Sequence, residues 1–139
     1  MTVVLNGNEL EMPIFGTLQN LGGLKGQSIA DSIDIAVSQS MFAFFAQYSS
    51  YEWGMAKLTC GTVQVWTNGY TDRLDFSTNQ IQNGAFLIHS HPMSAHYALS
   101  CYDYDKAFLS NGYNVLFYNG QFRFFNYDGF IGYWKNSLW

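Results

Sequence analysis

The stretch that decides the fold runs from Ala85 to Asp103 and reads AFLIHSHPMSAHYALSCYD. Residues 85–89 are apolar up to a histidine, a pattern typical of a buried strand that delivers side chains at its carboxyl end. A helix is predicted over about Ala98–Leu109, and Asn111-Gly112 ends it because glycine is preferred just past a helix. The stretch therefore predicts a strand, a short connection and a helix, with polar side chains between them.

Two histidines, His89 and His91, lie two positions apart on the extended segment, so both side chains project to the same face. Asp103 lies on the predicted helix. Two imidazoles and one carboxylate suit Zn²⁺, and three protein ligands leave a fourth position for water, as in catalytic zinc sites. Zinc lowers the pKa of its bound water to about 7, which makes that water a usable nucleophile. We therefore predict a catalytic zinc site at His89, His91 and Asp103.

A hydrolase of this kind needs a general base near the water. The glutamates of the chain are Glu9, Glu11 and Glu52. Glu9 and Glu11 belong to a weakly patterned N-terminal region, whereas Glu52 stands between Tyr51 and Trp53 at the start of a predicted strand. A carboxylate that enters a core strand is costly unless it has a partner, and zinc would be that partner. Glu52 is therefore the candidate base.

One motif joins these residues to others, and it runs His89-Ser90-His91-Pro92, seven residues, Ser100, two residues, Asp103. This motif resembles that of the JAMM (JAB1/MPN+) zinc metallopeptidases, and Glu52 fits their upstream glutamate, over roughly residues 50–127. The resemblance implies zinc ligation by the two histidines and the aspartate, proton transfer by Glu52 and oxyanion stabilisation by Ser100. It also implies an α/β fold of the JAB/MPN, cytidine-deaminase-like type, a sandwich in which helices flank a curved mixed sheet. The implied substrate is a peptide or an isopeptide-linked protein.

A narrower resemblance concerns Tyr51-Glu52-Trp53-Gly54 and the terminal hairpin over 113–126, which look like JAB domains of bacterial polymorphic (Rhs-type) toxins. It implies an exported effector with a neutralising partner protein. The short path from Glu52 to the motif leaves little room for the insertions that hold ubiquitin in deubiquitinating members, which argues against ubiquitin specificity. An alternative from another class is a zinc-stabilised binding module that holds a partner without cleaving it.

Composition excludes several other classes of protein. The chain has 139 residues, which fits one domain, and 48% hydrophobic with 19% aromatic residues argue against disorder. A net charge of −4 with six cations argues against general nucleic-acid binding. Neither a membrane-spanning apolar stretch nor a signal peptide is visible, so we expect a soluble domain, cytoplasmic or exported within a larger protein. The two cysteines are too few for a disulfide framework, although they could form one bridge with each other.

The chain divides into a weakly patterned segment, 1–27, with a strand at Thr2–Leu5 and otherwise loop, and a single JAMM-like domain, 28–139. A helix is predicted to begin at Ser28, because Ser28 and Asp31 resemble a capping box. Apolar residues at helical spacing predict a core-packing stripe, more than a cofactor site. The stripe consists of Ile29, Ile33, Ala36, Val37, Met41, Phe44, Phe45 and Tyr48.

Two hairpins are predicted further along. Trp53–Cys60 and Thr62–Thr67 flank Gly61, and the second hairpin, 113–118 with 121–126, is joined by Asn119-Gly120, a dipeptide that favours a type I′ turn. Residues 70–83 are polar and predict a loop. The aromatic tail 130–139 could continue the core, cover an edge strand or form an oligomer surface.

The remaining residues near the motif have plainer interpretations. Ser90 points away from the two histidines, which favours a structural role, with a substrate contact through its hydroxyl or backbone as the alternative. The others are expected in the core, in a loop or on the surface, with a wall of the substrate cleft as the alternative for His96 and the tyrosines. They are Cys60 and Cys101 (core), His96 (exposed loop), Asp105 (exposed), and Tyr97, Tyr102 and Tyr104 (core).

Overall fold

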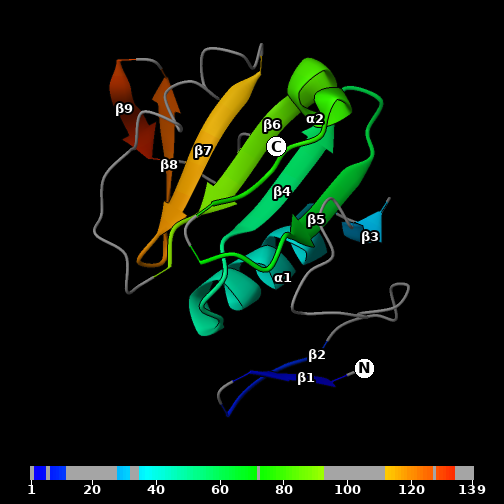
Figure 1. The fold of residues 1–139 in the computed structure, drawn as a ribbon, viewed down its shortest axis with the longest axis vertical. Coiled ribbons are helices and arrows are strands. Elements are labelled where there is room, and N and C mark those ends of the chain that lie inside the picture. The colour runs from blue at the N-terminus through cyan, green and yellow to red at the C-terminus, as the bar shows by residue number, and fades with distance from the viewer. Residues whose placement is uncertain are drawn as a thin grey trace.

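The computed structural model describes residues 2–5, 7–11, 28–31, 35–71, 73–92, 112–126 and 128–133. Its main sheet has the spatial order β3-β5-β4-β6-β7-β8-β9 (Figure 1). The strands are β3 (Ser28–Asp31), β4 (Trp53–Leu58), β5 (Val63–Thr67), β6 (Gly84–Ser90), β7 (Tyr113–Tyr118), β8 (Gln121–Asn126) and β9 (Gly129–Tyr133). Neighbouring strands are antiparallel except β6 and β7, which run parallel. With its helices, this mixed sheet confirms the predicted α/β class.

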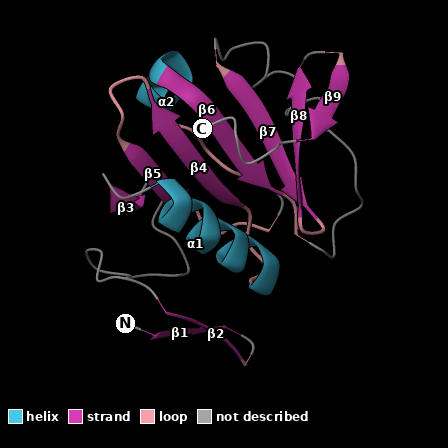
Figure 2. Ribbon diagram, turned by 180° about the vertical axis from the view of Figure 1, so that it is seen from behind, coloured by secondary structure: helices cyan, strands magenta, loops and turns pink. Residues whose placement is uncertain are grey.

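Helix α1 (Ile35–Tyr48) lies across the face of the sheet that Figure 2 shows. Its Phe45 is fully buried and stacks on Trp53 of β4 with ring centroids 4.5 Å apart. Such aromatic contacts bury large areas and dominate the energy of a core. The strand residues of this core are Trp53, Met55, Val63, Val65, Phe86, Ile88, Val115, Phe117 and Phe124.

The opposite face of the sheet carries a second, smaller core. Its members are Ala56, Leu58, Trp66, Leu74 and Leu87, with Phe76 packed against them. Because side chains alternate along a strand, Leu87 and His89 share this face of β6, while Ile88 and Ser90 face α1. The two predicted metal-binding histidines therefore belong to the side of the sheet that α1 does not cover.

Both predicted hairpins are confirmed. β4 and β5 pair antiparallel around Gly61, whose φ of +96° suits glycine. Asn119 and Gly120 have φ values of +52° and +77°, as a type I′ turn between β7 and β8 requires. The prediction for Cys60 is wrong: β4 ends at Leu58, and Cys60 lies exposed in the turn rather than in the core.

The predicted helix start at Ser28 is also wrong. Residues 28–31 form β3, which pairs with β5, and the helix begins only at Ile35. The backbone of β3 forms hydrogen bonds with the edge of β5 that β4 leaves open. These hydrogen bonds stabilise the strand more than a helix cap at Ser28 would stabilise a helix. The later part of the apolar stripe is confirmed, since Met41, Phe44 and Phe45 are buried.

Two further segments differ from the predicted loops. Residues 70–83 contain helix α2 (Thr78–Asn83), which begins with a capping box: the Gln80 amide donates to Ser77 Oγ, and the Ser77 amide donates to Gln80 Oε1. Near the N-terminus, β1 (Thr2–Leu5) forms as predicted, but the expected loop beyond it contains β2 (Asn8–Glu11). The two strands make a separate hairpin about Gly7.

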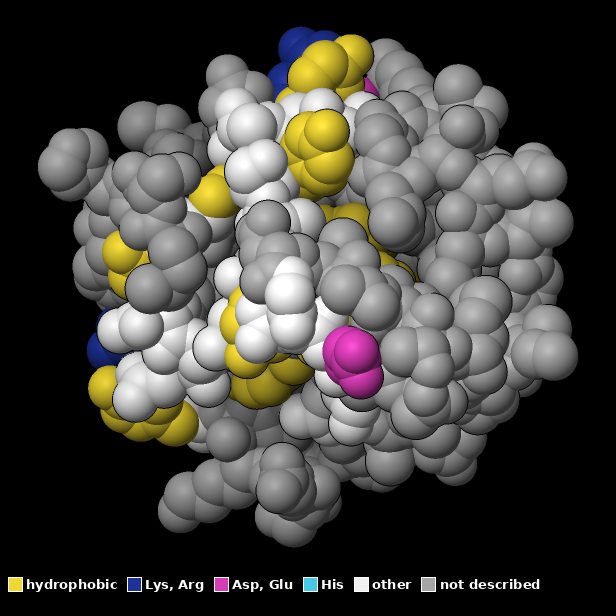
Figure 3. Space-filling view, turned by 90° about the horizontal axis from the view of Figure 1, so that it is seen from below, with side chains coloured by type: hydrophobic (Ala, Val, Ile, Leu, Met, Phe, Trp, Pro, Cys, Tyr) yellow, Lys and Arg dark blue, Asp and Glu magenta, His cyan; other side chains and the backbone are white. Residues whose placement is uncertain are grey.

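The predicted helix over 98–109 and the end of the aromatic tail, 134–139, lie outside the described residues. The beginning of the tail forms β9, which pairs with β8 and so covers the edge of that strand. Among the helices that the structure describes, none is long and apolar enough to cross a membrane. Figure 3 shows one end of the molecule, where hydrophobic side chains are visible at several separate places among the described residues.

Candidate active site

The carboxyl end of β6 brings the two histidines together, as their spacing predicts. His89 is 2% exposed and His91 follows the last strand residue, with ring centroids 5.4 Å apart. The His91 amide donates to the Phe117 carbonyl at 3.1 Å, which continues the parallel pairing of β6 with β7 beyond Ser90. This bond keeps the chain extended, so both imidazoles project to one side.

His89 lies in an aromatic setting next to a glycine. The rings of Phe76 and Phe125 meet it edge-on, with centroids at 6.4 and 5.6 Å. Across the strand pair, Gly54 of β4 is its register partner. A Cβ atom on Gly54 would lie 2.5 Å from the Trp66 ring, so the close approach of this indole requires glycine there.

Glu52 reaches the same place from the start of β4. It precedes Gly54 by two residues and therefore shares the sheet face of Gly54 and His89. Its side chain is buried, and its Oε1 lies 3.7 Å from His91 Nε2. This separation is longer than a direct hydrogen bond and is that of a close ion pair when the imidazole is protonated.

The backbone of Glu52 is held on both sides by the end of β5 and the residues just after it. Its amide donates to the Tyr70 carbonyl at 2.9 Å, and its carbonyl accepts the Thr67 hydroxyl at 2.7 Å. The carboxylate is therefore carried by a backbone segment whose amide and carbonyl are both hydrogen-bonded. Sequence reasoning missed Thr67 and Tyr70, because no local signal shows that residues so far along the chain return to Glu52.

Ser90 links the two halves of the site. Its side chain is fully buried on the α1 face, and its Oγ accepts the Trp53 amide at 2.8 Å. The structure therefore confirms that Ser90 points away from the histidines and is structural. It also shows a link that the sequence does not reveal: the Ser90 hydroxyl joins the histidine segment to Trp53, the residue that follows Glu52.

Several predicted site residues lie outside the described part of the chain. They are the zinc ligand Asp103, the oxyanion residue Ser100, and the neighbours His96, Tyr97, Cys101, Tyr102, Tyr104 and Asp105. Within the described ranges there is no group of three or more His, Cys, Asp and Glu side chains that could hold a metal ion. The described part of the site consists of His89, His91 and Glu52.

These three side chains suit a particular chemistry. Neutral imidazole nitrogens are ordinary zinc ligands, and a buried carboxylate beside them can accept and return a proton. The described donors therefore fit a zinc ion that needs one further ligand from the chain.

Comparisons of the chain with protein-family models, with curated proteins and with solved structures found no match.

Proposed function

We propose that this chain is a JAMM-type zinc metallopeptidase that hydrolyses an amide bond in a peptide or isopeptide-linked substrate. One observation carries the proposal: Glu52, which directly precedes β4, is buried with its Oε1 3.7 Å from the Nε2 of His91, which directly follows β6. A buried carboxylate with a partner in a cluster of titratable groups is typical of a functional site. The mixed α/β sheet is compatible with the JAB/MPN fold, which is part of the proposal.

His89, His91 and Asp103 would hold the zinc ion. When bound, the ion supplies a Lewis acid for the scissile carbonyl and lowers the pKa of the attacking water. Glu52 accepts the proton of that water at its carboxylate and passes it to the leaving amine. Ser100 donates a hydrogen bond to the oxyanion, and loss of one such donor costs about 10²–10³ in kcat in other enzymes.

The first test is metal content, measured by elemental analysis of the untagged chain. We expect about one zinc per chain in the parent and in Glu52→Gln, and little in Asp103→Ala. Asp105→Ala is the matched control: it removes a carboxylate two positions away and should keep its zinc. A parent chain that contains no zinc and cannot be loaded with zinc would overturn the proposal.

The second test is cleavage of a peptide library by the zinc-loaded chain. Glu52→Gln should abolish cleavage while zinc stays bound, because it removes the base and not a ligand. If Glu52→Gln keeps the full rate while Glu9 or Glu11 variants lose it, the base is misassigned. A parent that binds zinc and cleaves no peptide or isopeptide would favour the non-catalytic binding module. An exported effector would differ in biological role and not in this chemistry.

A further inference from the structure

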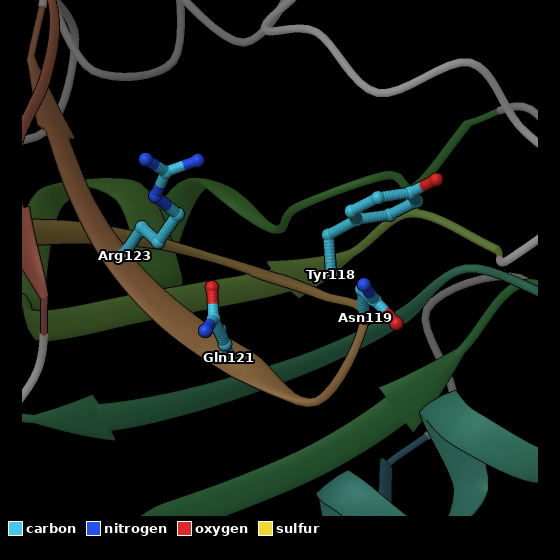
Figure 4. A pocket seen from close by; sticks show the side chains of 4 residues that line it. All are labelled: Tyr118, Asn119, Gln121 and Arg123. Carbon is cyan, nitrogen blue, oxygen red and sulfur yellow. The ribbon is translucent and has the colours of Figure 1, made fainter.

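A pocket of about 170 Å³, lined by side chains that carry polar groups, lies at the turn between β7 and β8. Tyr118, Asn119, Gln121 and Arg123 line it, and Figure 4 shows Tyr118, Gln121 and Arg123 rising from the same side of the hairpin. Glu52, His89 and His91 do not line this pocket.

The strand register places this pocket beside the candidate active site. Leu116 of β7 pairs with His89 on one side and with Arg123 on the other, so the three side chains form one row on one face. Neighbouring strands are about 4.8 Å apart, which puts Arg123 roughly 10 Å from His89 across the sheet. Tyr118 directly follows Phe117, whose carbonyl accepts the His91 amide. The pocket and the histidines therefore lie on the same face of the sheet.

The chemistry of the pocket is that of a carboxylate receptor. The Arg123 guanidinium lies over the rings of Phe130 and Tyr133, at 4.3 and 4.9 Å from their centroids. Stacking uses the faces of the planar group and orients its N–H edge, which matches both oxygens of a carboxylate. The Gln121 amide and the Tyr118 hydroxyl add neutral donors.

We propose that this pocket binds a carboxylate of the polypeptide substrate, on one side of the scissile bond. An extended chain advances about 3.3 Å per residue, so a carboxylate in the pocket would lie about three residues from the bond beside His89. This inference rests on the proposed function, since it takes the substrate to be a polypeptide laid across the site. It makes the peptidase selective for acidic sequences or for a chain end.

The test measures binding rather than turnover. The full chain carrying Glu52→Gln is titrated, with and without zinc, into fluorescein-labelled pools of eight-residue peptides, followed by fluorescence anisotropy. One pool has an internal glutamate and an amidated end, a second has glutamine instead, and a third has no acidic side chain but a free carboxyl end. We expect the first or the third pool to bind about tenfold or more tightly than the glutamine pool, because a hydrogen-bonded charge is at stake. The pool that binds identifies the source of the carboxylate.

Arg123→Gln should remove this preference, and Arg123→Lys should keep only part of it, because a lysine retains the charge and loses the fork. Lys57→Gln is the matched control. It removes the same charge from β4, two residues from Met55 and so on the opposite face of the sheet, and should leave the preference intact. Arg123→Lys keeps the test valid if Arg123→Gln does not fold.

Equal binding of all three pools, or a preference that survives in Arg123→Gln, would overturn the pocket assignment. That failure is distinct from failure of the peptidase proposal. A chain that selects the carboxylate but never holds zinc would retain the pocket and lose the peptidase. A zinc enzyme that treats all three pools alike would do the reverse.

Discussion

Replacing Ser90 by alanine tests whether one buried hydroxyl holds the two halves of the site together. The substitution removes the acceptor of the Trp53 amide, and water cannot replace it, since Ser90 is 0% and Trp53 1% exposed. A buried donor left without its acceptor costs about 1–3 kcal/mol. We therefore expect the free energy of unfolding to fall by about 2 kcal/mol, which is about a 30-fold change in the folding equilibrium.

If the chain is the peptidase proposed above, the same substitution should slow catalysis beyond its effect on stability. The lost bond joins Trp53, which follows Glu52, to Ser90, which lies between the two histidines. Glu52 would keep its backbone bonds to Thr67 and Tyr70, but its carboxylate would be placed less exactly relative to the imidazoles. A misplacement of about 1 Å can cost about 10²-fold in rate. We expect kcat to fall by roughly 10- to 100-fold, with KM and zinc content unchanged, because both histidines stay on their own strand.

Urea denaturation followed by tryptophan fluorescence gives the stability, and steady-state cleavage gives kcat and KM. Ser49→Ala is the control, because Ser49 Oγ accepts the Trp53 indole N–H at 2.7 Å without reaching β6. It should lower stability by about 1 kcal/mol and leave kcat intact. Ser90→Thr keeps the hydroxyl and should restore kcat. The reasoning is refuted if Ser90→Ala loses less than about 0.5 kcal/mol, within the usual scatter of surface substitutions, or if Ser49→Ala and Ser90→Ala lower kcat equally.

Two other outcomes follow from the structure. Gly54→Ala should destabilise the chain by about 1–3 kcal/mol, because its Cβ would meet the Trp66 ring, which is held by a 3.0 Å hydrogen bond to the Asp75 carbonyl; strictly additive effects of Gly54→Ala and Trp66→Phe in urea denaturation would disprove this contact. Hydrogen bonds with Thr62 lower the pKa of the exposed Cys60 thiol, so Thr62→Val should raise that pKa and move the pH midpoint of iodoacetamide alkylation upward; an unmoved midpoint would show that the Thr62 hydroxyl has no such effect.

Local signals predicted the parts of the fold whose structure depends on neighbours in sequence. Asn119-Gly120 needs only its own two positive φ values to make a hairpin, and that turn forms where predicted. Ser77 and Gln80 make a capping box that the sequence displays, yet the polar surroundings led to a predicted loop. Ser28 and Asp31 gave a similar signal that proved wrong, because pairing with β5 decides that segment. A cap is thus informative only where no sheet edge competes for the same backbone.

In the candidate site too, the features set by local sequence could be predicted, and those set by contacts between distant segments could not. The spacing of His89 and His91 follows from strand geometry alone, and the structure brings their rings together. The nearness of Glu52 to His91 depends on β4 pairing with β6, which no local pattern reveals; the choice of Glu52 rested on the cost of burying a lone carboxylate. The supports from Thr67 and Ser90 could not be foreseen, because their partners are backbone groups.

The pairing of β4 with β6 also determines when the site can exist. Glu52 directly precedes β4, and the histidines lie at the end of β6 and just after it. Because β5 and α2 separate these two strands in sequence, pairing β4 with β6 carries the entropy cost of closing a long loop. Before β4 and β6 pair, the segment that carries both imidazoles is not held next to the Glu52 carboxylate. The cluster of Glu52, His89 and His91 therefore exists only in the assembled sheet, and under the proposed function an unfolded chain would lack the arrangement needed to attack itself or its neighbours.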